Sequence, residues 1–206
     1  MPIRDYSGPR LFQDFIRTKP GYDDQQGDVS TALIGTAQWT TEQIRDTGFI
    51  VPWLRHDQDD FFQIRVQFTH RRKLQTNLAS LHIHAIPGGA VSGNVYFSYA
   101  YTWVKADDTI PAISGWTSGN ITTAVAGTDQ WKHKVYNLLT NISPPTSESH
   151  SAMLLVKLSR LGTNILDTYT DSKPSGTAQA NFGVLYLDCH TQVDKPGSDN
   201  ELTDTF

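Results

Sequence analysis

The sequence holds a single cysteine, Cys189, among its 206 residues. An internal disulfide and a cysteine-rich metal box are therefore both excluded, and the composition is typical of a chain that folds in a reducing cytosol. Cys189 lies in the apolar run VLYLDCH, which predicts a buried and inert thiol. Its neighbour His190 is a poor partner for a nucleophilic thiol, because adjacent residues of a strand face opposite ways.

The chain also has no excess of basic residues and no long apolar run. Its formal net charge is −4, so it lacks the basic patch or stripe that is typical of nucleic-acid-binding proteins. No window approaches the roughly 18 apolar residues of a membrane span. The first ten residues, MPIRDYSGPR, lack the basic-then-apolar pattern of a secretory signal. We therefore expect no nucleic acid partner, no membrane partner and no secretory processing.

Motifs of known catalytic machinery are missing as well. The sequence contains no GxSxG nucleophile elbow, no phosphate-binding glycine loop, no HExxH and no EF-hand loop. The acidic pairs Asp23-Asp24, Asp59-Asp60 and Asp107-Asp108 fall in predicted loops, where solvated turn residues are the usual interpretation. We therefore predict a protein that is not an enzyme and that uses no cofactor.

What the sequence does contain is the alternation of β-strands. Apolar residues at every second position from Phe62 to Phe68 predict a half-buried strand. Residues 77–86, 93–105 and 176–192 predict further strands, and the second of these is rich in aromatic side chains. Residues 49–54 predict a short edge strand, because Pro52 interrupts them.

Three other regions are less regular. The Gly/Thr/Ser-rich residues 109–127 predict short strands at best, and WKHKVYNLLT (131–140) fits a strand or a helix. SAMLLVKLSRLG (151–162) favours a strand but has some helical periodicity. Because no strand–helix–strand alternation is present, a parallel sheet is not expected.

The predicted fold class is therefore all-β: an antiparallel β-sandwich of jelly-roll type. The uneven connections favour a jelly roll over a regular meander or propeller. We expect an extended N-terminal arm or loop over residues 1–30, the sandwich over residues 31–192 and a polar C-terminal tail over residues 193–206.

Two histidines, His82 and His84, are one residue apart in the run SLHIHAIPGG and so share a face of the predicted strand. Imidazoles suit Zn, Cu, Fe and Ni, and cupin-type metal sites begin with a similar HxH. Such sites add a carboxylate a few residues later, but no acidic residue follows His84 closely. His190, with Asp188 on its face, is the best candidate for a third ligand. We favour the alternative that the histidines pack in a polar-aromatic layer near His190, and we predict no metal.

One tryptophan, Trp116, lies in the loop-like stretch SGWTSGN. An aromatic side chain in such a setting stacks on sugars or anchors a protein interface. Trp116 is therefore a candidate contact for a glycan or for a partner protein.

Three segments resemble tailed-phage virion structural proteins of jelly-roll type. LHIHAIPGGAVSGNVYFSYAYTW (Leu81–Trp103) resembles their HxH strand, loop and aromatic strand. LSRLGTNILDTYTD (Leu158–Asp171) resembles their Arg-x-Gly…Asp-Thr-Tyr segment, and YLDCHTQVDKPGSDNE (Tyr186–Glu201) their Asp-x-His…Gly-Ser…Glu segment. Ala85 and Thr191 stand where that pattern has aromatic residues. The N-terminal third is not covered.

The resemblance implies a β-sandwich protein of a phage particle. The first expectation is a capsid decoration, or cement, protein that binds at shell subunit junctions and stabilises the head. Its partners would be the major capsid protein or other virion proteins and further copies of itself, with a homotrimer expected. It would be located in the virion, assembled in the host cytoplasm. The alternatives are a head-fibre or tail-associated protein that contacts host glycans, and a cupin-like metalloenzyme.

Overall fold

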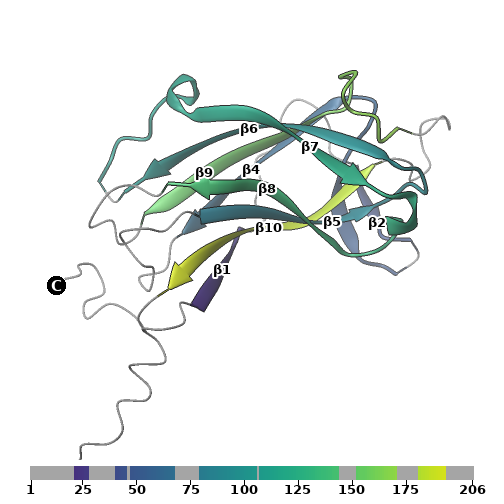
Figure 1. Ribbon diagram of the computed structural model, residues 1–206, viewed down its shortest axis with the longest axis horizontal. Helices are drawn as coiled ribbons and strands as arrows, with labels where there is room; N and C mark the ends of the chain where they lie inside the picture. Colours follow the sequence, from purple (N-terminus) through teal and green to yellow (C-terminus); the bar gives the residue numbers. More distant parts are fainter. Residues whose placement is uncertain are drawn as a thin grey trace, which may run out of the picture.

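The computed structural model describes residues 21–27, 40–45, 47–67, 79–105, 107–143, 152–170 and 181–193, which form two packed β-sheets (Figure 1). Sheet A has the strand order β2-β3-β10-β5-β8, and β1 also pairs with β10. Sheet B has the order β4-β9-β6-β7. The strands of sheet A are β1 (Gly21–Gly27), β2 (Thr40–Gln43), β3 (Ile50–Leu54), β5 (Ala79–Pro87), β8 (Lys134–Ile142) and β10 (Phe182–Val193). Those of sheet B are β4 (Asp59–Gln67), β6 (Gly93–Val104), β7 (Thr117–Val125) and β9 (Met153–Leu161).

The chain passes from one sheet to the other at nearly every connection between β3 and β10. Only β6 and β7 follow each other within one sheet, and every pairing is antiparallel. The eight strands β3 to β10, four in each sheet, are wound in this way and define a jelly roll, to which β1 and β2 add two further strands in sheet A. The prediction of an antiparallel jelly-roll β-sandwich is therefore confirmed.

Alternating side chains of both sheets fill the space between the layers. In β4 the buried positions are every second residue, because successive side chains of a strand point to opposite faces. The same alternation runs through β5 and β9. The largest fully buried apolar side chains of this core are Phe62, Phe97, Phe182, Leu54, Leu81, Ile83, Ile142, Leu154 and Leu158.

The prediction that residues 49–54 form an edge strand is wrong. β3 lies between β2 and β10 in sheet A. Its pairing with β10 is confined to Trp53 and Leu54, which come after Pro52. Pro52 therefore lies outside the hydrogen-bonded ladder between β3 and β10. That ladder does not require a donor at position 52, where proline has no N–H group.

The prediction of short strands at best over residues 109–127 is also wrong. β7 has nine residues and pairs with β6 along its whole length. Its sequence TSGNITTAV puts Thr123 and Val125 on the buried side and leaves Thr122 and Ala124 exposed. β7 lies at the edge of sheet B, and most of its side chains are exposed. Its sequence is therefore less hydrophobic than that of a typical strand, and for this reason the prediction missed it. Both ambiguous segments form strands: residues 131–140 overlap β8, and residues 151–162 contain β9.

Within the range predicted as an N-terminal arm, residues 21–27 form β1 and pair with residues 187–193 of β10. Residues 1–20 and 28–30 of that predicted arm, and residues 194–206 of the predicted tail, lie outside the described residues. Among the residues that the structure describes, no helix is long and apolar enough to cross a membrane.

A buried ion pair closes one end of the sandwich. Arg160 of β9 is fully buried and forms two hydrogen bonds with the carboxylate of Asp167, from Nε at 2.9 Å and from Nη2 at 2.8 Å. The same guanidinium donates to the carbonyl oxygens of Leu54 in sheet A and of Tyr169. Asp167 also accepts from the backbone N–H of Tyr96 in β6. One arginine therefore joins β9, both sheets and the segment that follows β9.

The segment after β9 fits closely against its surroundings. The hydroxyl of Tyr169 donates to the carbonyl of Gly89 and accepts from its N–H, at 3.0 and 2.8 Å. Gly162 packs against the carbonyl oxygens of Arg55 and Gln58, and a Cβ at this position would lie 2.6 Å from each. Any side chain there would therefore displace the turn that leads from Arg160 to Asp167.

Replacing Arg160 by methionine should destabilise the protein by about 3–5 kcal/mol, because Asp167 would be left as an unpaired buried charge. Urea unfolding followed by circular dichroism measures this difference. Arg65→Met is the matched control, since Arg65 is exposed on β4, and it should change stability by less than about 0.5 kcal/mol. The double variant Arg160→Met, Asp167→Leu should recover part of the loss. An Arg160→Met chain as stable as the Arg65→Met chain would contradict this account.

Candidate functional site

The HxH motif and the Asp-x-His motif face each other on the outer side of sheet A. β5 and β10 are antiparallel neighbours, and their register pairs His84 with Tyr186 and His82 with Asp188. Core residues alternate with these positions on both strands, so the motif side chains project from the face opposite the core. The sheet therefore brings together two motifs that are about a hundred residues apart in the sequence.

Three side chains of this surface form a compact group of possible metal ligands. His82 Nδ1 lies 3.2 Å from His190 Nε2. His190 Nε2 lies 3.0 Å from Oδ2 of Asp188, and His82 Nδ1 lies 3.9 Å from its Oδ1. One nitrogen or oxygen atom from each of the three residues lies within 4.8 Å of the others. The expectation that the histidines of the HxH strand lie near His190 is thus confirmed.

His84 borders this group without joining it. Its Nε2 lies 3.2 Å from Oδ2 of Asp188, and its Nδ1 lies 2.8 Å from Nε2 of His133. The imidazole also stacks on the ring of Tyr186, with 4.0 Å between the ring centroids. His84 is therefore held in orientation from three sides, with one ring nitrogen directed at the carboxylate.

Burial differs across the cluster. The side chain of Asp188 is 4% exposed, whereas that of His190 is 29% exposed. Asp188 Oδ1 has no hydrogen-bond partner among the described residues. A carboxylate without water around it needs compensating charge or hydrogen bonds, and here the surrounding imidazoles are the nearest groups that supply them.

The structure brings together His82, His84 and His190, the three histidines singled out from the sequence. Asp188, which the sequence places on the same strand face as His190, belongs to the group, so the carboxylate comes from β10 and not from a residue just after the HxH. Sequence reasoning missed the contact between His84 and His133, which depends on the turn before β8. A further histidine that follows the HxH in the sequence, His150, lies outside the described residues.

Trp116 follows the short 3-10 helix η1 (Ile113–Gly115) and is half-buried. Its indole Nε1 donates to the carbonyl oxygen of Pro111 at 3.0 Å. This hydrogen bond ties the indole to its own loop. The expectation that Trp116 contacts a glycan or a partner protein stays a prediction.

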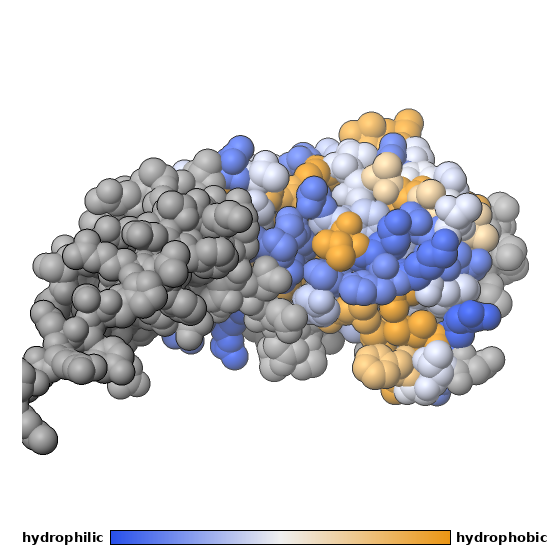
Figure 2. Space-filling view, turned by 60° about the horizontal axis from the view of Figure 1, so that its bottom comes forward, coloured by the Kyte–Doolittle hydropathy of each residue, from blue (hydrophilic) through white to orange (hydrophobic). Residues whose placement is uncertain are grey.

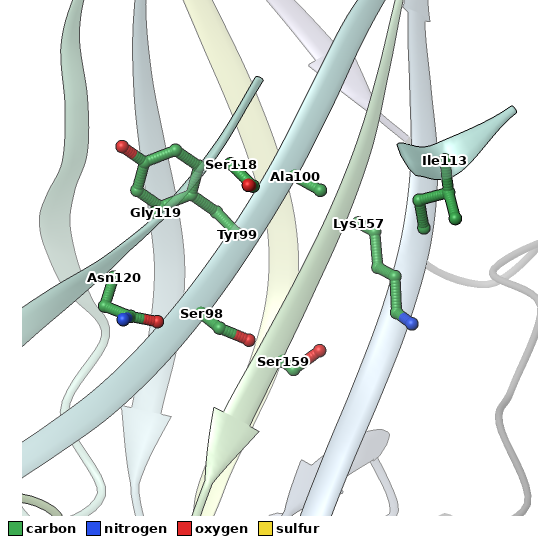
Figure 3. A pocket seen from close by; sticks show the side chains of 9 residues that line it. All are labelled: Ser98, Tyr99, Ala100, Ile113, Ser118, Gly119, Asn120, Lys157 and Ser159. Carbon is green, nitrogen blue, oxygen red and sulfur yellow. The ribbon is translucent and has the colours of Figure 1, made fainter. Parts of the chain in front are cut away.

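A second surface feature lies on the outer face of sheet B. A shallow hollow of about 340 Å³ crosses β6, β7 and β9, with η1 at its rim (Figure 3). Hydroxyl, amide and ammonium groups supply most of its polar atoms. The lining residues are Ser98, Tyr99, Ala100, Ile113, Ser118, Gly119, Asn120, Lys157 and Ser159.

No family model and no curated protein match this chain. Among solved structures, it is similar to CBM35, a carbohydrate-binding module from Cellvibrio japonicus Abf62, with 14% identity and a TM-score of 0.42. That similarity covers 82% of this chain and 92% of the module. A second similar structure is TmCBM61 in complex with beta-1,4-galactotriose, with 13% identity and a TM-score of 0.31, covering 82% and 86% of the two chains.

Cys189 lies on the core side of β10 and is fully buried. Burial raises the pKa of its thiol from 9.0 to about 12, and the negative charge of Asp188 adds to this effect. The unfolded chain would lose the thiol proton near pH 9 while the folded chain keeps it, so the contribution of this group to stability should fall as pH rises from 9 to 12.

We accordingly expect the thiol of the folded protein to resist alkylation by iodoacetamide at pH 8 and to react fully in urea, as mass spectrometry would show. The Cys189→Ala chain provides the blank. Alkylation of the folded protein at the rate of the unfolded chain would disprove the assignment of an inert core thiol.

Proposed function

We propose that this chain is a structural protein of a phage particle, a decoration protein that binds at junctions between shell subunits and has no catalytic activity. The observation that carries the proposal is an apolar pair held out into solvent by a tight turn. Ile165 is 90% exposed and Leu166 is 52% exposed. Such residues are typical of surfaces that another protein covers.

The turn that presents this pair is well ordered by local hydrogen bonds. Asn164 accepts from the N–H of Leu166 through its side chain and from the N–H of Asp167 through its carbonyl. Asp167 is in turn fixed by Arg160. A preordered apolar contact loses little conformational entropy on binding, which favours association.

Further exposed apolar side chains are available for contacts within an assembly. Phe49 and Ile50 are exposed at the start of β3, and Figure 2 shows hydrophobic groups at the rim of the described surface among hydrophilic ones. The resemblance to phage virion proteins includes the turn with Ile165 and Leu166. We assign the major capsid protein and other copies of this chain as the partners, with a trimer as the preferred oligomer.

The hollow on sheet B favours a second candidate, a head-fibre or tail-associated protein that binds host glycans. Serine hydroxyls and the amide of Asn120 line a shallow surface, as hydrogen-bonding groups for sugar hydroxyls would, and the side chain of Lys157 lies at its border (Figure 3). Ile113 at the rim offers an apolar contact, and it is exposed.

The decoration proposal predicts that the purified chain co-sediments with phage shells that lack it. The variant Ile165→Asp, Leu166→Asp should weaken this binding at least about tenfold, a loss of roughly 1.4 kcal/mol, while its thermal unfolding stays close to that of the unmodified chain. Ala124→Asp, an exposed change on β7, is the control. A chain that ignores shells but binds host cells or glycans would refute the decoration role.

The glycan candidate predicts binding on a glycan array that depends on the hollow. Lys157→Ala combined with Asn120→Ala should weaken it about tenfold, because each lost hydrogen bond costs about 0.5–1.5 kcal/mol. Thr122→Ala lies on the same strand as Asn120 but outside the hollow, and it should leave binding unchanged. Equal glycan binding by the double variant and the control would exclude this surface.

A further inference from the structure

We propose that His82, Asp188 and His190 bind one Zn²⁺ ion on the outer face of sheet A. The proposal is independent of the role in a phage particle. It assigns to β5 and β10 a metal centre with two imidazole ligands and one carboxylate, a donor set that zinc accepts.

The spacing of the three ligand atoms fits a metal ion. Zinc bonds of 2.0–2.1 Å with tetrahedral angles place neighbouring ligand atoms about 3.3 Å apart. His82 Nδ1 and His190 Nε2 are 3.2 Å apart, and His190 Nε2 lies 3.0 Å from Asp188 Oδ2. His82 Nδ1 lies 3.9 Å from the other carboxylate oxygen of Asp188, Oδ1, and one ligand atom from each of the three residues lies within 4.8 Å of the others. An ion at the centre of this group therefore requires only small side-chain shifts.

Proton counting also favours an ion. The Nε2 atom of His190 faces both a carboxylate oxygen of Asp188 and a ring nitrogen of His82. One ring nitrogen carries either one proton or one lone pair, so it cannot make a full hydrogen bond with both. A metal ion would instead accept a lone pair from each of the three ligand atoms.

The carboxylate gives a separate argument. Asp188 is almost completely buried, and its Oδ1 has no hydrogen-bond partner among the residues that the structure describes. An unsatisfied buried carboxylate oxygen carries a desolvation cost. A divalent cation bound on this side of Asp188 would remove that cost, while Oδ2 keeps its contact with His84.

The surroundings of the ligands resemble the outer shell of metal sites, in which hydrogen bonds orient the first ligands. His84 fills this role for Asp188, and its ring is fixed by stacking on Tyr186 and by contact with His133. His84 is therefore a positioning residue and not a ligand in this arrangement.

Three protein ligands leave one position of a tetrahedral zinc ion open. His190 is the most exposed of the three, with 29% of its side chain accessible. The open position would therefore be reached from solvent and would hold water. Because the ligands come from β5 and β10, bound zinc would also link these two strands and stabilise the folded chain.

The test uses the full chain without a histidine tag, stripped with EDTA and titrated with Zn²⁺ in a calorimeter. We expect one ion per chain, a rise in the unfolding temperature with zinc and, with Co²⁺ as a probe, the visible absorption of a tetrahedral site. Asp188→Asn and His190→Ala should each abolish stoichiometric binding, and His84→Ala should weaken it about 10–100-fold.

His56→Ala is the matched control, because His56 lies in the turn between β3 and β4 and should leave zinc binding unchanged. Circular dichroism checks that each variant is folded, and the partly exposed His190 supplies a test if Asp188→Asn fails to fold. Absence of stoichiometric zinc binding by the unmodified chain would overturn the proposal. Binding by folded His190→Ala protein that equals that of the His56→Ala control would also overturn it.

Discussion

The pairing of Arg160 with Asp167 is the interaction on which one whole end of the sandwich depends. The guanidinium lies among core side chains with no exposed surface, so each of its hydrogen bonds replaces one to water. Its acceptors belong to sheet A, to the segment after β9 and to Asp167, which also receives an N–H from β6. Loss of this cation would leave buried acceptors without a donor in three parts of the chain at once. Because Asp167 ends the turn that holds Ile165 and Leu166, the ion pair also fixes the geometry of that turn.

The three segments from which a phage virion protein was predicted perform two structural tasks in this fold. The Arg-x-Gly…Asp-Thr-Tyr segment supplies the buried ion pair, the close approach at Gly162 and the tyrosine that bonds Gly89. The HxH and Asp-x-His segments supply the cluster on sheet A. The HxH and Asp-x-His segments are far apart in the sequence but adjacent in the fold, because the last strand, β10, lies beside β5. These segments therefore contain residues with definite physical roles, and their resemblance to phage virion proteins stays a prediction from the sequence.

The alternation of apolar and polar residues along the sequence predicted the strands in which buried and exposed side chains alternate. It predicted the strand character of β4, β5 and β6 and placed His82 and His84 on one face. It failed for β7, whose exposed face is polar, and for β3, whose central position depends on β2 and β10 pairing from either side. The burial of Arg160 was not predicted, because KLSRLG is typical of a half-exposed strand. The partner that allows this arginine to be buried, Asp167, comes from the segment after the strand. The pairing of His82 with Asp188 was likewise beyond local reasoning, since it follows from a register between distant strands.

The two proposed binding features use different parts of the molecule, and this separation has a physical consequence. The apolar turn is held by the ion pair at one end of sheet B, whereas the zinc ligands project from the outer face of sheet A on strands that pair directly. No described residue belongs to both groups. Effects of substitutions at sites without shared partners usually add, so zinc should stabilise the sandwich without altering the turn. A change in shell binding on removal of zinc would then have to be transmitted through β10, the strand that pairs with β1, β3 and β5.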